Sequence, residues 1–212
     1  QAACLIDERE YADAFSILKE ALIINRDFLN SVDEAARKKS PRNNSDLLEE
    51  CMQSLHMKQH FFADDSDDFI YRSPIRIPEG SQTNHTDYNF HVTLSVLLVF
   101  NLALAHHLCG LEGTTRADML EKAVYLYTLS QQIFEQQGLD TIAFILAVTN
   151  NIGQIRKTLG QTEVADELFQ RMLTTLLYLN QYLWDTKEFC LEGFFRNTTH
   201  LVLTNSHTAK AA

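Results

Sequence analysis

Apolar residues recur at helical spacing along most of the chain, and the clearest case is the stretch 150–177. Ile152, Ile155 and Leu159 share one helical face, and Gly160 follows as a residue that tolerates the left-handed backbone that ends a helix. A second apolar stripe begins soon afterwards, made of Val164, Ala165, Leu168, Phe169, Met172, Leu173, Leu176 and Leu177. The pattern predicts two helices folded back on each other.

Two further stretches carry a similar pattern. An apolar helix predicted at 89–107 can be laid over the later one without gaps, which places Asn101 on Asn151 and Ala103 on Gly153. Ala103 and Gly153 are small, as expected where a second helix approaches closely. The helix that follows 89–107 is predicted from its inner stripe, Leu120, Ala123, Val124, Tyr127 and Phe134.

The turns of these two helix pairs differ in length. Gly110 falls on Gly160 in the same overlay, but Ala123 lies 13 residues after Gly110, whereas Ala165 lies 5 after Gly160. We therefore expect an eight-residue insertion in the turn after Gly110.

The beginning of the chain matches only the second helix of such a pair. Ala14, Leu18 and Ala21 take the inward positions of 11–22. Twelve residues before Ala14 lies Ala2, the same separation as between Ala165 and Gly153. We expect the chain to open partway through a first helix, and the natural protein to extend further upstream.

Residues 62–88 interrupt the helical pattern. Within them, residues 69–78, which we call the strap, alternate apolar and polar side chains and contain Pro74 and Pro78. Proline disfavours helix in the residue before it, so the strap is predicted to be extended. A connection this long is often functional or packed against the protein. Its apolar residues suggest that the strap lies in a groove of its own chain.

The combination of Gly153 early in a first helix, Ala165 early in a second and Phe169 four residues later resembles a tetratricopeptide repeat (TPR). The two complete repeats lie 42 residues apart at Ala123 and Ala165, against the family's period of about 34, so the resemblance is to a divergent member. It implies an all-α fold of antiparallel helix-turn-helix repeats, a right-handed α-solenoid, with one long extended connection. TPR proteins build binding surfaces rather than reaction centres.

The chain also resembles a large group of uncharacterised proteins in diatoms, in sequence segments such as 71–78, 100–108, 150–155 and 191–197. This resemblance implies no activity. We expect one domain over 1–212. Its predicted parts are a partial first repeat at 1–37, an irregular insertion and strap at 38–88, a second repeat at 89–137, a third repeat at 139–183 and a C-terminal capping helix at 187–203.

The TPR resemblance also implies a site. In that family the first helices line a concave groove, and an asparagine two residues before the small residue commonly bonds the backbone of an extended peptide. Here those residues are Asn101 and Asn151. Neighbouring groove positions would be Phe100, Leu104, His107, Asn150, Gln154 and Lys157. Alternatively, the two asparagines bond the chain's own strap.

Composition narrows the partners. A net charge of −10 and a pI near 5.2 argue against nucleic-acid binding and favour a basic or neutral protein partner. The four cysteines form no C-x-x-C pair, which favours an intracellular, reducing compartment, cytoplasmic or nuclear; an organelle stays open because the start looks incomplete. The apolar run 92–105 contains Asn101 and is too short to span a bilayer. N-x-S/T triplets occur at Asn43, Asn84 and Asn197, and chance explains them in the absence of a signal peptide.

Two histidine groups could bind metal. His56 and His60 lie four residues apart, a spacing that can hold zinc, and His85, Asp87 and His91 match a two-histidine, one-carboxylate iron site. The first group has no catalytic glutamate beside it, and the second normally sits on a β scaffold.

The sequence thus predicts a non-catalytic protein-interaction module or assembly subunit, without a cofactor, that binds a protein segment through its groove or outer face. The alternative is a metal-dependent enzyme or metal-binding protein that uses these histidines.

Overall fold

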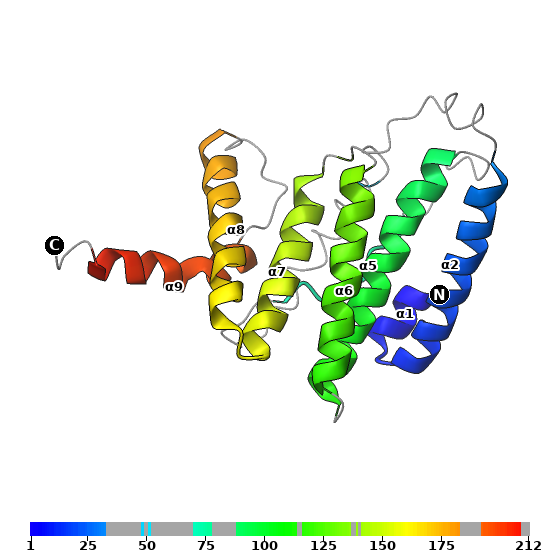
Figure 1. Cartoon of the computed structure of the whole chain (residues 1–212), viewed down its shortest axis with the longest axis horizontal. Coiled ribbons are helices and arrows are strands. Elements are labelled where there is room, and N and C mark those ends of the chain that lie inside the picture. Colours follow the sequence, from blue (N-terminus) through cyan, green and yellow to red (C-terminus); the bar gives the residue numbers. More distant parts are fainter. Residues whose placement is uncertain are drawn as a thin grey trace. The chain divides into compact units, whose positions relative to one another are not determined.

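The computed structural model describes residues 1–32, 48, 51, 70–77, 88–113, 116–136, 139, 141–182 and 192–208. This part of the chain contains helices and no strand, so the all-α prediction is confirmed (Figure 1). The helices are α1 (Ala2–Asp7), α2 (Tyr11–Ser31), α5 (Tyr88–Glu112), α6 (Arg116–Gln136), α7 (Ile142–Thr158), α8 (Thr162–Tyr182) and α9 (Glu192–Thr208). Residues 70–77 of the strap carry no helix.

The chain forms two compact units. The first consists of Gln1–Leu55 and Arg72–Phe144, and the second of His56–Tyr71 and Ile145–Ala212. The chain therefore passes between the units three times, after Leu55, inside the strap and inside α7. The helix bounds lie within a few residues of those predicted for 89–137 and 139–183, while the grouping of these helices into repeats of one array stays a prediction.

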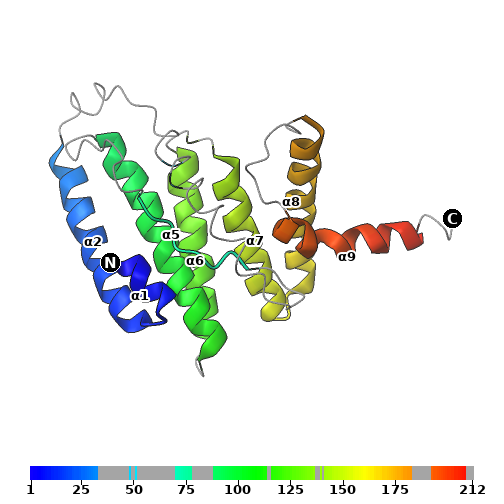
Figure 2. The ribbon, with the colours of Figure 1, turned by 180° about the vertical axis from the view of Figure 1, so that it is seen from behind.

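In the first unit, α5 lies between α2 and α6 and packs against both (Figure 2). Its 25 residues extend well beyond the apolar run 92–105, because polar residues at both ends continue the helix. By length and composition α5 is long enough to cross a membrane, which corrects the expectation that this run is too short. However, 78% of its most apolar window is buried inside the protein, and this burial accounts for its composition.

Gly110 differs from its predicted role. It lies inside α5 rather than after it, and a Cβ placed on it would lie 3.0 Å from Leu120 Cδ2 of α6. The expected insertion after Gly110 therefore lengthens α5 to Glu112 instead of forming only a longer turn. The absence of a side chain here serves the close approach of two helices.

In the second unit, the turn between α7 and α8 follows the prediction. Gly160 has φ 75°, and its N–H bonds Lys157 O while Gln161 N–H bonds Arg156 O, the pair of bonds of a Schellman motif. Gly153 also has its expected role, since a Cβ there would lie 2.6 Å from Phe169 Cε1 of α8. The two helices thus approach as closely as the sequence predicted.

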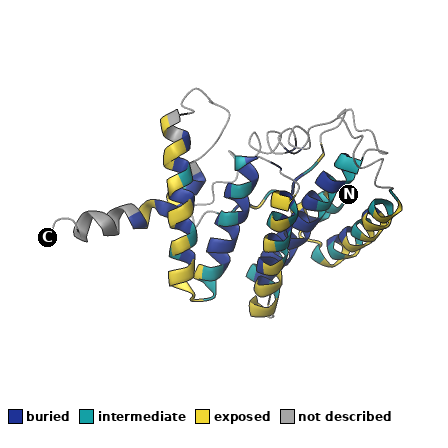
Figure 3. Ribbon diagram, turned by 45° about the horizontal axis from the view of Figure 1, so that its top comes forward, coloured by how far each residue is buried: buried dark blue, intermediate teal, exposed yellow. Residues whose placement is uncertain are grey.

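The buried stripe of α8 is narrower than predicted. Its members Ala165, Phe169, Met172, Leu173 and Leu176 are buried, and Figure 3 shows the resulting buried and exposed faces of the helix. Val164 and Leu177 are exposed, contrary to the prediction. Each lies one residue outside the buried stripe, and a one-residue step turns the side chain by about 100° around a helix.

The C-terminal helix also differs from its predicted range. α9 packs against α8 and runs from Glu192 to Thr208, whereas 187–203 was predicted. Residues 204–208 contain neither glycine nor proline, so nothing in the local sequence ends the helix at 203. The predicted start at 187 lies outside the described residues.

Candidate functional site

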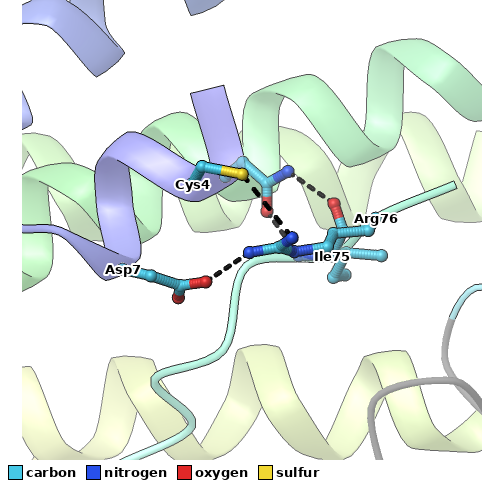
Figure 4. A network of polar contacts seen from close by, with 5 residues as sticks. Cys4, Asp7, Ile75 and Arg76 are labelled. Atoms are coloured by element: carbon cyan, nitrogen blue, oxygen red, sulfur yellow. Dashed lines mark hydrogen bonds and ion pairs between the residues drawn. The ribbon is translucent and has the colours of Figure 1, made fainter. Parts of the chain in front are cut away.

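In the first unit, Asn101 on α5 holds the backbone of one strap residue. Its Oδ1 accepts a hydrogen bond from Ile75 N at 2.8 Å, and its Nδ2 donates to Ile75 O at 2.8 Å (Figure 4). Both residues are buried. A side-chain amide carries one acceptor and one donor group, so it matches the N–H and C=O that one extended residue presents on the same side.

The second unit contains the same arrangement. Asn151 on α7 accepts from Tyr71 N at 2.8 Å through Oδ1 and donates to Tyr71 O at 2.9 Å through Nδ2. Asn151 and Tyr71 are both 0% exposed. Neither asparagine contacts the side chain of its strap residue through these bonds, so the recognition is of backbone.

The two asparagines therefore bond the strap, which was one of the two alternatives for them. Tyr71 and Ile75 are four residues apart, so in an extended segment their backbone groups point to the same side. Binding of a separate protein segment at Asn101 and Asn151 stays a prediction.

A series of hydrogen bonds between buried side-chain amides leads from α9 to Asn151. Asn197 on α9 donates through Nδ2 to Asn150 Oδ1 at 2.6 Å, and Asn150 donates through Nδ2 to Asn151 Oδ1 at 3.2 Å. The amides thus connect α9 through α7 to Tyr71 within the second unit. Asn197 is 5% exposed, and its amide donates to Asn150. Its N-x-T triplet is therefore not accessible for glycosylation.

Arg76 connects the strap to α1. Its guanidinium forms an ion pair with the Asp7 carboxylate, and its Nη1 lies 3.7 Å from Cys4 Sγ (Figure 4). The side chains of Arg76 and Asp7 are 36% and 50% exposed, so water reaches both charges. The Arg76 side chain thus adds an ion pair to the backbone bonds of the neighbouring Ile75.

Three predicted groove residues on α5 lie in the core of the first unit. Phe100, Leu104 and His107 are each 0% exposed, and the Phe100 and His107 rings pack edge-on to Tyr127. Burial, assisted by the positive charge of Arg72, lowers the pKa of His107 to about 3. The imidazole is therefore neutral near pH 7, and neither ring nitrogen has a hydrogen-bond partner in the described part of the chain.

The remaining predicted positions lie on α7 in the second unit. Asn150 has the bonds given above, Gln154 is buried, and Lys157 is exposed. The structure thus places the predicted residues in two sets, one in each unit, and most of their side chains are packed inside the protein.

Of the candidate metal ligands, His56, His60, His85 and Asp87 lie outside the described residues. His91 is described, and its contacts connect α5 to α2. Its Nδ1 is hydrogen-bonded to Asn25 Oδ1, and its ring stacks on Phe28 at a centroid distance of 3.6 Å. No group of three potential ligands occurs among the described side chains.

Asn25 and Asn197 are structural polar residues that the sequence reasoning missed. Asn25 also donates to His91 O at 2.8 Å and to Ser95 Oγ at 2.7 Å. Each asparagine lies within an apolar helical stripe, since Asn25 continues the spacing of Ala14 and Leu18, and Asn197 lies between Phe194 and Leu201. The sequence signal for both residues is an asparagine at a helical position where the apolar spacing predicts a buried side chain.

Comparison with protein-family models, with curated proteins and with solved structures finds no match to the chain.

Proposed function

We propose that the protein is a non-catalytic protein-interaction module. Its helix pairs are TPR-like repeats of a right-handed α-solenoid, and Asn101 and Asn151 hold an extended segment of a partner protein in place of the strap. The observation that supports this proposal is the repeated geometry of the two asparagines, each of which bonds both backbone groups of a single strap residue.

Backbone recognition makes exchange of the strap feasible. Every extended segment, except at proline, presents the same N–H and C=O groups, so a partner segment can form the bonds that Tyr71 and Ile75 form now. Hydrogen bonds lost from the strap are regained with the partner. The relative affinity of the strap and the partner segment then depends on the side chains that each places around the backbone contacts.

Charge indicates the class of partner. The chain has a net charge of −10, which attracts a basic segment and disfavours an acidic one. We also propose an intracellular, reducing compartment, and no disulfide joins the described cysteines.

The test compares proteins that co-purify with wild type and with the double variant Asn101→Ala/Asn151→Ala from the native source. A partner lost from the double variant, with helical circular dichroism retained, would support the groove as its binding site. Asn30→Ala is a matched control, because it removes an exposed amide from α2.

Retention of the same partners by the double variant would contradict binding at the asparagines. It would point instead to the outer faces, where Ile23, Ile24 and Tyr125 expose large apolar side chains.

A further inference from the structure

Beside the backbone bonds of the strap, the Arg76 side chain forms an ion pair with α1. Its guanidinium lies between the Asp7 carboxylate and Cys4 Sγ, next to the residue whose backbone Asn101 holds (Figure 4). The preceding side chain, Ile75, is 3% exposed. An apolar contact and a charge contact therefore follow each other at 75 and 76, within the first unit.

We infer that Asp7, with Cys4 beside it, selects a basic side chain in the partner segment. The segment that replaces the strap carries an aliphatic residue at Asn101 and an arginine or lysine directly after it. This inference rests on the proposed function, and it adds the chemistry of the partner.

Two charges favour a basic residue, that of Asp7 and that of the whole chain, and the geometry favours arginine among the basic residues. The Asp7 carboxylate is the described group that neutralises Arg76, so a segment with a neutral or acidic residue would leave it without its counter-charge. Arginine suits the site better than lysine because one guanidinium N–H can meet the carboxylate while another meets the sulfur. The net charge of −10 adds a long-range attraction of the same sign.

The same contact is easily exchanged. Arg76 and Asp7 are half exposed, and exposed ion pairs contribute little to stability because water and salt screen them. A partner arginine therefore displaces Arg76 without breaking a buried charge pair.

The experiment measures binding of two labelled peptides by fluorescence anisotropy at physiological salt. One peptide copies residues 70–77, and the other has glutamate at the position of Arg76. The protein is the full chain carrying Arg76→Ala, which removes the competing charge from the strap. We expect the first peptide to bind roughly three to ten times more tightly than the second, as for one exposed ion pair gained against one like-charge contact.

Adding Asp7→Lys should invert this preference. Glu8→Lys makes the same charge change at a neighbouring exposed residue and should leave the preference close to that of the Arg76→Ala chain. Circular dichroism of each variant checks the helical content. If a variant loses helix, Asp7→Asn in the same background is the replacement, and it should abolish the preference.

Binding of both peptides with equal affinity, or a preference that Asp7→Lys does not change, would overturn the inference and leave the proposed function standing. If neither peptide binds any variant at protein concentrations above about 1 mM, the effective concentration of the tethered strap, the strap does not exchange and both proposals are wrong. Dimerisation of the Arg76→Ala chain that prevents peptide binding would identify a second copy of this chain as the occupant, and would also overturn the inference.

Discussion

Replacing Asn101 with aspartate tests the backbone pairing directly. Asn101→Asp keeps the size and shape of the side chain, but a carboxylate cannot donate to Ile75 O as Nδ2 does now. A protonated carboxyl group can, because its O–H donates while its other oxygen accepts from Ile75 N. The variant should therefore hold the strap at low pH and release it at high pH.

Two limits bound the size of the effect. The lost bond leaves a buried carbonyl unsatisfied, which costs about 1–3 kcal/mol, and burial of a carboxylate adds to this. The variant can instead keep its proton, at a cost of about 1.4 kcal/mol for each pH unit above the usual aspartate pKa near 3.9. This ceiling is about 5 kcal/mol at pH 7.5 and about 1.5 kcal/mol at pH 5.

The sign follows from the direction of the pKa change. The held strap raises the pKa of the introduced carboxyl group, so protons bind more tightly when the strap is in place. The stabilisation is fully present below the free pKa near 3.9 and is lost as the pH rises to the raised value. We expect a cost of about 3–5 kcal/mol at pH 7.5 and at most about 1.5 kcal/mol at pH 5.

Hydrogen exchange of the Ile75 amide measures this cost, since that N–H is the donor to Asn101 Oδ1. Its protection factor in Asn101→Asp should fall by roughly 100-fold to 3,000-fold at pH 7.5 and by about tenfold or less at pH 5, relative to wild type. Asn30→Asp introduces the same charge at an exposed site and should leave the amide protected at both pH values. Equal losses at the two pH values, or full protection at pH 7.5, would refute the paired geometry.

Three further changes test the packing around these contacts. Gly153→Ala places a methyl group 2.6 Å from Phe169 Cε1, so urea unfolding should show a loss of about 1–3 kcal/mol, partly recovered by adding Phe169→Leu; no loss would mean that the helices lie further apart. Burial lowers the pKa of His107 to about 3, so the stability that depends on the neutral imidazole is fully present above about pH 6.5 and is lost as the pH falls towards 3. The free energy of unfolding, measured in urea, should therefore fall from about pH 7.5 to about pH 5 in wild type. In His107→Leu this fall should be smaller by about 2 kcal/mol. Asn197→Leu removes the donor to Asn150 and should lower the free energy of unfolding of the second unit by about 1–3 kcal/mol, and an unchanged thermal transition would contradict the amide chain.

Features set by local spacing could be predicted from the sequence. The buried stripe of α6 and the left-handed Gly160 follow from 3.6-residue periodicity and from the conformational freedom of glycine, which are properties of neighbouring residues. Gly110 shows the limit of this reasoning. Its overlay on Gly160 was correct as a count of residues, but the helix continues past it because the following residues permit helix.

Contacts between distant residues could be predicted only in part. Asn151 bonds a residue 80 positions away, and the sequence offered the strap as one of two occupants without deciding between them. Asn25 and Asn197 bond partners 66 and 47 positions away, and Arg76 pairs with Asp7 across 69 positions. No periodicity relates such pairs, because they meet only after the helices have packed.

The strap is part of the same chain as the asparagines that bind it, so the fraction of molecules with the strap bound does not depend on protein concentration. A tethered segment of this kind acts at an effective concentration on the order of 1 mM. If its intrinsic dissociation constant were about 10 μM, the strap would be in place about 99% of the time, and a free segment of equal affinity would bind about 100-fold more weakly than it would to an open groove. A partner anchored by a second contact gains its own effective concentration and escapes this penalty. The tether thus sets a threshold that favours bivalent partners over free peptides of the same sequence.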